Sequence, residues 1–419
     1  MIPKISQILI IADDLSGAAD CTAGAMRAGL ATQVTLGSVL SAHHAADAPQ
    51  VWSIDADTRR LPPAEAVRIN GEILARCRKP GQLLYKKIDS TLRGNFAAEL
   101  APMLALAGMA VVAPAFPDTG RCTRNGRQYV NGVALEETEI WRHEGMSGTA
   151  DISKMLSGRG MRTALLSLAQ VRAGHAMLRH SIHECMLQGT QAVVCDAETN
   201  DDLQRIAQAS IDISPSIFWV GSAGLAYQLP HAAGLVGRIE PVRTIEVRGP
   251  ILTVVGSLSA VSRRQAQALS SARPVARVDI PADVLGGAEL HGDWSRYQTR
   301  LGATLESGDD MLLVVCDAGR PDMRHGWALC QALARLVSPF SARLGGMVST
   351  GGETTHALLS AFDATGLSMM REVQPGIPLS VALGPRAFPV ITKAGAFGSG
   401  EALVYCYDTL LRMRKDQSV

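Results

Sequence analysis

The chain has 419 residues, more than one ordinary hydrophobic core accommodates, so two domains are expected. The formal net charge of +1 provides no general basic surface for nucleic acid or an anionic membrane, and an aromatic content of 4% leaves few rings for base stacking. Hydrophobic residues (47%) greatly outnumber charged residues (19%), which is typical of a well-packed α/β protein and excludes a disordered chain.

The cysteines and apolar segments indicate a cellular compartment. None of the eight cysteines forms a C-x-x-C pair, and several lie in apolar runs such as residues 193–195, so reduced, buried thiols are expected rather than disulfides or a zinc site. No apolar segment approaches the ~20 residues that cross a bilayer. The first four residues lead into a strand rather than a signal peptide. We therefore predict a cytoplasmic protein.

The first predicted strand, residues 8–12, ends at two adjacent carboxylates, Asp13 and Asp14, and Ser16 lies in the helix that follows. Because like charges repel, adjacent carboxylates at a strand end are typical of a site for a hydroxylated substrate, a metal or a proton in transit. Asp14 acting only as a helix cap is the alternative. No G-x-G-x-x-G follows the strand, which excludes a dinucleotide fingerprint.

Two more strands are predicted at residues 33–36 and 50–55, the second ending in a charged segment, residues 55–59. A helix over residues 64–77 leads to an apolar run at 81–84 that we interpret as a buried strand. The turn that follows this strand carries five polar residues before a helix for which Asn95 is a suitable N-cap: Lys87, Asp89, Ser90, Thr91 and Arg93.

These five residues lie between a strand and a helix, where open α/β sheets bind ligands. Two cations, two hydroxyls and a helix N-terminus predict an anion site, and the carboxylate of Asp89 adds a potential base. The alternative is an exposed loop with a solvated ion pair.

Strand and helix continue to alternate through the first half. A strand at 109–113 runs into a Pro- and Gly-bearing loop, and Asn131-Gly132 between apolar residues predicts a type I′ hairpin over 129–133, as a lid or dimer contact. Strands follow at 163–166, 192–196 and 217–220, and the last enters Gly221-Ser222-Ala223-Gly224, a second turn able to approach an anion. The alternation predicts an α/β fold with a mostly parallel sheet.

The periodicity fails between residues 229 and 249, where we place the domain boundary, giving domains 1–232 and 250–415. Strands in the second half are predicted at 251–255, 311–315, 344–349 and 389–392. Three of them end in turns rich in glycine and hydroxyl groups, at 256–259, 350–354 and 393–398.

Glycine turns let backbone amides approach phosphate oxygens, and Lys393 could neutralise charge that develops there. Any one turn could need glycine for steric reasons alone, but three in one domain favour nucleotide binding. Neither a P-loop nor the protein-kinase motif set is present. Asp317 is a candidate Mg²⁺ contact or a turn cap.

Eight motif blocks, in this order along the chain, resemble the four-carbon acid sugar kinases: residues 12–18, 86–95, 113–117, 129–132, 221–225, 256–259, 349–354 and 392–398. The resemblance implies an N-terminal substrate domain, a C-terminal ATP-binding domain and an active site in the cleft between them. It implies transfer of the γ-phosphoryl group of ATP, with Mg²⁺, to the 4-hydroxyl of a tetronate. It assigns ATP contacts to Ser257, Gly351, Gly352, Glu353, Thr354, Gly395, Ala396, Phe397 and Gly398, to which the turns themselves add Ser259 and Lys393.

The first two blocks look like those of the D-threonate or D-erythronate type rather than the 3-oxo-tetronate type. We therefore expect D-threonate as substrate, with D-erythronate, L-threonate or 3-oxo-tetronate as alternatives and a non-catalytic sugar-acid-binding protein as a more distant one. The substrate carboxylate is expected at Arg93 and Lys87, and Asp89 or Asp14 is expected to orient and deprotonate the 4-hydroxyl. The full predicted substrate set is Asp13, Asp14, Ser16, Lys87, Asp89, Ser90 and Arg93. The Mg²⁺ ligands stay unassigned, and a homodimer is a further expectation.

Overall fold

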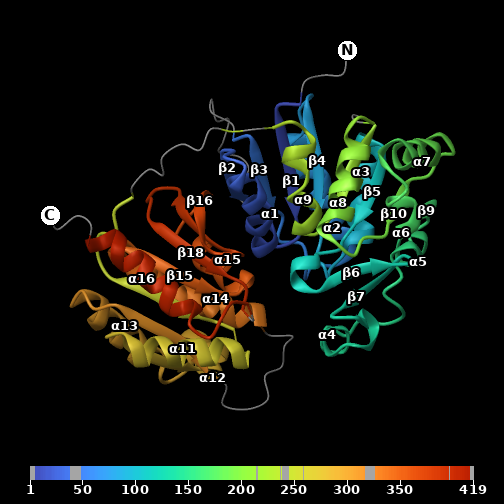
Figure 1. Cartoon of the computed structure of the whole chain (residues 1–419). Coiled ribbons are helices and arrows are strands. Elements are labelled where there is room, and N and C mark those ends of the chain that lie inside the picture. Colours follow the sequence, from blue (N-terminus) through green and yellow to red (C-terminus); the bar gives the residue numbers. More distant parts are fainter. Residues whose placement is uncertain are drawn as a thin grey trace. The chain divides into compact units, whose positions relative to one another are not determined.

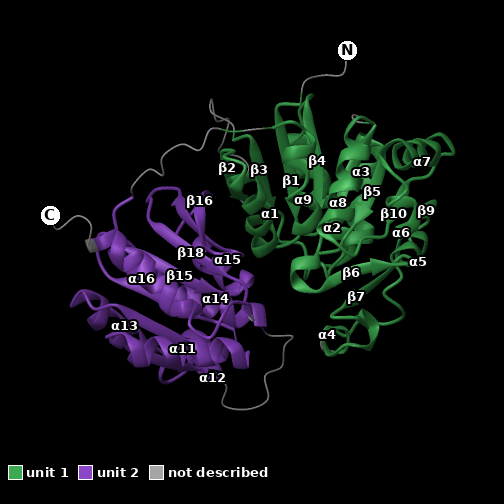
Figure 2. Ribbon diagram, in the orientation of Figure 1, with its two compact units in different colours: residues 1–240 green, residues 241–419 purple. Residues whose placement is uncertain are grey.

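The computed structural model describes residues 5–37, 49–213, 216–235, 237, 245–257, 259–316, 326–395 and 397–415. The chain divides into two compact units, residues 1–240 and 241–419 (Figures 1 and 2). No helix in these described ranges is long and apolar enough to cross a membrane.

The sheet of the first unit consists of eight parallel strands in the order β2-β3-β1-β4-β11-β5-β10-β9. Their bounds are Gln7–Ala12 (β1), Thr32–Leu36 (β2), Val51–Asp55 (β3), Gln82–Lys87 (β4), Met109–Ala113 (β5), Thr163–Leu166 (β9), Ala192–Cys195 (β10) and Ile217–Gly221 (β11). The expected α/β class with a mostly parallel sheet is confirmed.

Alternate residues of each strand feed two hydrophobic layers, one on each face of this sheet. Ile8 and Ile10 belong to one layer, and Leu9 and Ile11 to the other. The first layer is covered by α1 (Leu15–Arg27), α6 (Leu168–Val171), α7 (His175–Leu187), α8 (Asn200–Ile211), α9 (Ala223–Ala226) and α10 (Leu229–Ala232). The second is covered by α2 (Pro63–Cys77), α3 (Phe96–Ala107), α4 (Glu139–His143) and α5 (Ile152–Ser157).

The strand order of the first unit reverses at β1. After β1 the chain forms β2 and β3 on one side of it, and then crosses to β4 on the other side. Open α/β sheets bind ligands at such a switch point, outside the carboxyl ends of the two central strands. Here those ends are Ala12 and Lys87, which pair with each other in the sheet.

A small antiparallel sheet follows β5, formed by β6 (Arg121–Arg124), β7 (Arg127–Val130) and β8 (Val133–Ala134). The hairpin predicted at Asn131-Gly132 is confirmed, with φ angles of 50° and 83° at the two turn residues. A second Asn-Gly turn, Asn125-Gly126, joins β6 to β7 with φ angles of 48° and 71° and went unnoticed in the sequence.

The second unit has the strand order β13-β14-β12-β15-β18-β17-β16, in which β16 and β17 are antiparallel. Strand bounds are Ile251–Val255 (β12), Ala276–Pro281 (β13), Met311–Cys316 (β14), Gly346–Thr350 (β15), Gly366–Gln374 (β16), Ile377–Leu383 (β17) and Pro389–Lys393 (β18). We did not predict β13, β16 or β17, although Pro375-Gly376 between β16 and β17 is a turn signal, with φ of 73° at the glycine.

Helices α11 (Ala260–Ala272) and α16 (Ala402–Lys415) pack on one face of this sheet, through side chains that include Leu269 and Leu403. Helix α14 (Gly326–Val337) packs against α12 (Ala282–Gly287), α13 (Trp294–Glu306) and α15 (Gly352–Ala361). At their carboxyl ends, β13 leads into α12 and β15 leads into α15.

Candidate substrate and nucleotide sites

Three neighbouring strands of the first unit, β3, β1 and β4, end in polar residues at the same edge of the sheet. The loop after β3 is bound to the end of β1 by the amides of Ala56, Thr58 and Arg59, which donate to the carbonyls of Ala12 and Asp13 at 2.8–3.1 Å. The charged segment that follows β3 is therefore brought against the Asp13-Asp14 pair.

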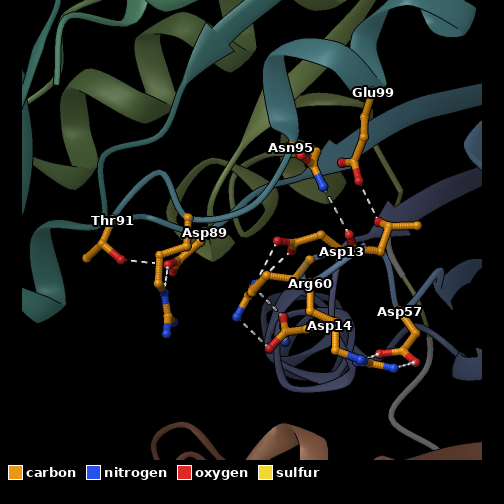
Figure 3. A network of polar contacts seen from close by, with 12 residues as sticks. Asp13, Asp14, Asp57, Arg60, Asp89, Thr91, Asn95 and Glu99 are labelled. Carbon is orange, nitrogen blue, oxygen red and sulfur yellow. Dashed lines mark hydrogen bonds and ion pairs between the residues drawn. The ribbon is translucent and has the colours of Figure 1, made fainter. Parts of the chain in front are cut away.

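Arg59 lies between the two predicted carboxylates and binds both. Its guanidinium donates to both oxygens of Asp13 and both oxygens of Asp14, at 2.7–2.9 Å (Figure 3). The next residue, Arg60, pairs instead with Asp57 (Figure 3). Burial raises the pKa of Asp13, but Arg59, Lys87 and Lys86 outweigh burial and hold the pKa below its ordinary value. Arg59 thus helps the buried carboxylate of Asp13 to stay ionised.

Asp89 is buried and bound by its own turn. Its Oδ2 accepts hydrogen bonds from Thr91 Oγ1, at 2.6 Å, and from Arg93 Nε (Figure 3). Burial raises the pKa of Asp89, but Arg93, Arg59 and Lys87 lower it far more, so the pKa lies well below its ordinary value. Arg93 also contacts Glu144 at 3.2 Å. These cations therefore favour the ionised form of Asp89, which can accept hydrogen bonds.

Lys87 is a buried cation whose ammonium makes no hydrogen bond or ion pair with any residue that the structure describes. Its Nζ lies against the first turn of α1, where a Cβ added to Gly17 would be 2.5 Å away. The N-terminus of a helix is positive and disfavours a cation, and an unpaired buried charge is costly. An anionic ligand bound here would relieve both costs.

Buried polar contacts hold the turn after β4 in place. Lys86 forms an ion pair with Glu99 at 2.7 Å, both side chains being fully buried, and Glu99 also accepts from Thr58 Oγ1 (Figure 3). Asn95 is the N-cap residue of α3, as predicted, but its side chain makes no capping bond, and its amide donates to the carbonyls of Leu61 and Thr58. The prediction also ended the strand at residue 84, whereas β4 continues to Lys87.

The remaining predicted substrate residues lie at the same strand ends. Asp14 both binds Arg59 and caps α1, accepting from the amide of Gly17 at 2.9 Å, so it is not only a helix cap, and its contact with a ligand stays a prediction. Ser16 is a partly exposed residue of the first turn of α1, and Ser90 is partly exposed, its carbonyl accepting from Gln128 at 2.8 Å. All seven predicted residues therefore follow or end β1 and β4.

The turn at Gly221–Gly224 is explained by packing alone. A Cβ on Gly221 would be 2.5 Å from the carbonyl oxygen of Ala113, and one on Gly224 would be 2.6 Å from that of Ala115. Ser222 is buried and donates to Ala115 at 2.8 Å. Glycine is needed here for the close approach of two backbones, not for an anion.

The three glycine turns of the second unit follow β12, β15 and β18, which are neighbours in its sheet. They touch one another. A Cβ on Gly395 would be 2.5 Å from Ser257 Oγ, a Cβ on Gly256 would overlap Thr354, and the amide of Gly351 donates to the carbonyl of Lys393 at 2.8 Å. The structure thus brings the three predicted turns into one site.

The predicted nucleotide contacts within this site fall into three groups. Gly352, Glu353 and Thr354 form the first turn of α15, and Ser259 caps α11, accepting from the amide of Ser262 at 3.1 Å. Phe397 and Gly398 lie in the turn after β18. Ala396, like Asp317, lies outside the described residues.

Lys393 has different partners from those expected. Its Nζ donates to the carbonyls of Ala394, Gly395 and Phe397 at 2.8–2.9 Å, which uses all three ammonium protons. Burial lowers the pKa of Lys393 to about 8, although carbonyl acceptors favour the charged form. This ammonium has no proton left for a phosphate.

Comparison with known proteins identifies the family. Residues 8–229 match the model of a sugar-binding N-terminal domain, and residues 252–403 match that of a nucleotide-binding C-terminal domain. The chain is 43% identical over 409 residues to a D-threonate kinase of Cupriavidus necator, covering 97% of this chain and 98% of that protein. The chain belongs to the four-carbon acid sugar kinase family. The resemblance seen in the motifs is confirmed.

Other members of the family match as fully. A D-threonate kinase of Bordetella bronchiseptica is 33% identical, with 94% of this chain and 95% of that protein covered. A D-erythronate kinase of Heliobacterium modesticaldum is 30% identical, with 97% and 98% covered. A crystal structure from Salmonella typhimurium has a TM-score of 0.80 at 21% identity, with 96% of this chain and 98% of that chain covered, and shares the fold.

Sequence reasoning did not single out Arg59, which the structure places between the predicted carboxylates of Asp13 and Asp14. The signal was available, because residues 55–59 were recognised as a charged segment at a strand end. What was missing was the position of β3 beside β1, which follows from the strand order and not from the local pattern.

Proposed function

We propose that this chain is an ATP-dependent kinase that transfers the γ-phosphoryl group of ATP to the 4-hydroxyl of D-threonate, forming 4-phospho-D-threonate and ADP. The first unit binds the sugar acid and the second binds ATP, in keeping with the descriptions of the two family models. Relatives named as D-threonate kinases, at 43% and 33% identity, support this substrate over the other tetronates.

The observation that carries the proposal is the buried ammonium of Lys87, which pairs with no residue that the structure describes and lies beside a cluster of carboxylates. A tetronate supplies the complementary groups, a carboxylate at one end and hydroxyls along its length. Its carboxylate binds Lys87 and Arg93, and its hydroxyls donate to Asp14 and Asp89, with Ser16 and Ser90 as further hydrogen-bonding groups. Asp13, which is held by Arg59, fixes the position of that guanidinium.

Asp89 orients the 4-hydroxyl in this proposal, and Asp14 is the alternative. A general base works best when its pKa lies near the working pH, and the pKa of Asp89 lies far below it. Phosphoryl transfer proceeds largely through a loose transition state, which asks more for positioning than for a strong base. Asp89 therefore accepts a hydrogen bond from the hydroxyl and takes up the hydroxyl proton only as the new P–O bond forms.

ATP is bound by the three glycine turns of the second unit, which contact one another. The amides of Gly395 and Gly398 have no acceptor among the described residues, so this part of the chain fits a phosphate group. Mg²⁺ accompanies the nucleotide and neutralises charge on its phosphate oxygens. The donor set of the metal is left unassigned.

An ADP-release assay over the stereoisomeric tetronates tests the proposal. We expect D-threonate to give the highest kcat/KM. If D-erythronate, L-threonate or 3-oxo-tetronate gives the highest value instead, that tetronate is the substrate and the reaction is still ATP-dependent phosphorylation. No turnover with any tetronate, together with thermal stabilisation by the acid but not by MgATP, would indicate a non-catalytic sugar-acid-binding protein instead.

A further inference from the structure

The carbonyl groups after β18 are turned toward the interior of the second unit. The ammonium of Lys393 donates hydrogen bonds to the carbonyls of Ala394, Gly395 and Phe397. From α11, Gln265 donates to the carbonyls of Phe397, Gly398 and Ser399 at 2.6–3.3 Å, and Ser262 donates to that of Gly395. The side chains of Lys393, Gln265 and Ser262 thus bind five carbonyl groups. These belong to Ala394, Gly395, Phe397, Gly398 and Ser399.

The amides opposite these carbonyls face the other way. In a trans peptide the C=O of one residue and the N–H of the next point in opposite directions. Inward carbonyls at residues 394, 397, 398 and 399 therefore turn the N–H groups of Gly395, Gly398, Ser399 and Gly400 outward. None of these four N–H groups has an acceptor among the residues that the structure describes.

A row of such amides, just before the first turn of α16, is suited to bind an anion such as a phosphate group. Gly398, Ser399 and Gly400 are exposed, so a ligand can reach their amides. The ammonium of Lys393 points its protons at carbonyls, so it adds no hydrogen bond on the side to which these amides turn.

We propose that Lys393 and Gln265 are positioning residues for the triphosphate of the nucleotide. They do not touch the phosphate; they hold the carbonyls inward and thereby aim the amides at it. This inference deepens the proposed function and rests on it, because ATP is taken as the ligand. It differs from the expectation that Lys393 neutralises phosphate charge directly.

Direct binding of ATP and ADP, measured by titration calorimetry, tests the proposal in the full-length chain. Lys393→Met and Gln265→Leu each remove the donors while keeping much of the side-chain volume. Both should weaken nucleotide binding, by about 10- to 100-fold, the scale of a 1 Å misplacement. Lys393→Arg should recover part of the loss. D-threonate binding should stay at the wild-type level in all three variants.

A matched control separates positioning from general destabilisation. Tyr407→Phe removes a buried hydrogen bond of 2.6 Å to Asp310 within the same unit, where Asp310 also binds the amide of Ile251 at the start of β12. This variant should lower Tm without changing nucleotide affinity. If Tyr407→Phe weakens nucleotide binding as much as Gln265→Leu at a similar Tm, the effect is one of stability and the proposal fails.

The two variants also separate positioning from direct contact. If Lys393 touched the phosphate, Lys393→Met would weaken binding while Gln265→Leu would not, and that pattern would overturn the proposal. Wild-type affinity in Lys393→Met would overturn it as well. If the wild-type chain binds no ATP at all, the proposed function fails first, which is distinguishable from normal wild-type binding with unaffected variants.

Discussion

Gly17→Ala tests the position of Lys87 without removing a charged group. A Cβ at residue 17 would be 2.5 Å from Lys87 Nζ and 2.6 Å from Asp14 Oδ1, whereas ordinary contacts begin at 3.4 Å. Lys87 must therefore move by about 0.9 Å, the difference between 3.4 and 2.5 Å. Because Nζ is the end of a flexible side chain, it moves more easily than the backbone.

The magnitude follows from that displacement. A charge-assisted N–H···O bond of about 2.8 Å, lengthened by this amount, exceeds the limit of a hydrogen bond. Such a bond to a charged group contributes about 1.5–3 kcal/mol. We therefore expect the KM for D-threonate to rise about 10- to 150-fold. Alanine is the better helix former by about 0.5–1 kcal/mol, which offsets the local strain and leaves Tm nearly unchanged.

The assay is the KM for D-threonate at saturating ATP, with Tm measured on the same samples. Gly71→Ala is the matched control, since it also adds a methyl group within a helix but its Cβ would meet only Pro102, at 3.7 Å. Lys87→Met should raise KM by a similar factor, and the double variant Gly17→Ala/Lys87→Met should be no worse than Lys87→Met alone. A wild-type KM in Gly17→Ala would refute the placement of the substrate carboxylate at Lys87.

Three further predictions follow from the same cluster. Asp89→Asn should leave ATP binding near normal and lower kcat about 10²- to 10⁴-fold, and an unchanged kcat would remove Asp89 from the chemistry. Glu99→Ala should lower the free energy of unfolding by about 3–5 kcal/mol, because it removes the carboxylate that pairs with the buried Lys86 ammonium. Denaturant titration measures this loss, and the double variant Lys86→Met/Glu99→Leu, which removes both charges, should lose less. The pKa values of Asp13 and Asp89 are lowered from 3.8, so the stability that these groups contribute is fully present above that pH and is lost as the pH falls through their folded-state pKa values. Arg59→Met should move the acid unfolding transition to higher pH, and an unshifted transition would contradict this prediction.

Strand ends were the part of the site that the sequence predicted well. Asp13 and Asp14 follow a run of apolar residues, and Lys87 to Arg93 follow another, so both segments were placed at the carboxyl edge of a parallel sheet. The two strands are neighbours in the sheet, so these segments lie side by side. The family resemblance placed both segments in the substrate-binding domain. The glycine turns at 256–259, 350–354 and 393–398 were predicted by the same reasoning.

The errors concern directions that a one-dimensional pattern does not encode. Lys393 stands beside a glycine turn, and the sequence cannot tell whether its protons face phosphate or carbonyls. Asn95 precedes a helix but binds the loop after β3 instead. Leu92 adopts φ of 57° while fully buried, a costly conformation for a large residue that the surrounding contacts impose and no propensity predicts.

The central claim is that the chain itself phosphorylates D-threonate at the expense of ATP, and ³¹P NMR of the reaction mixture tests it most directly. We expect a new phosphomonoester resonance that grows in equal amount with ADP, only when MgATP and D-threonate are both present. ADP accompanied by inorganic phosphate alone, or an unchanged ATP spectrum with every tetronate, would show that the chain does not phosphorylate a tetronate.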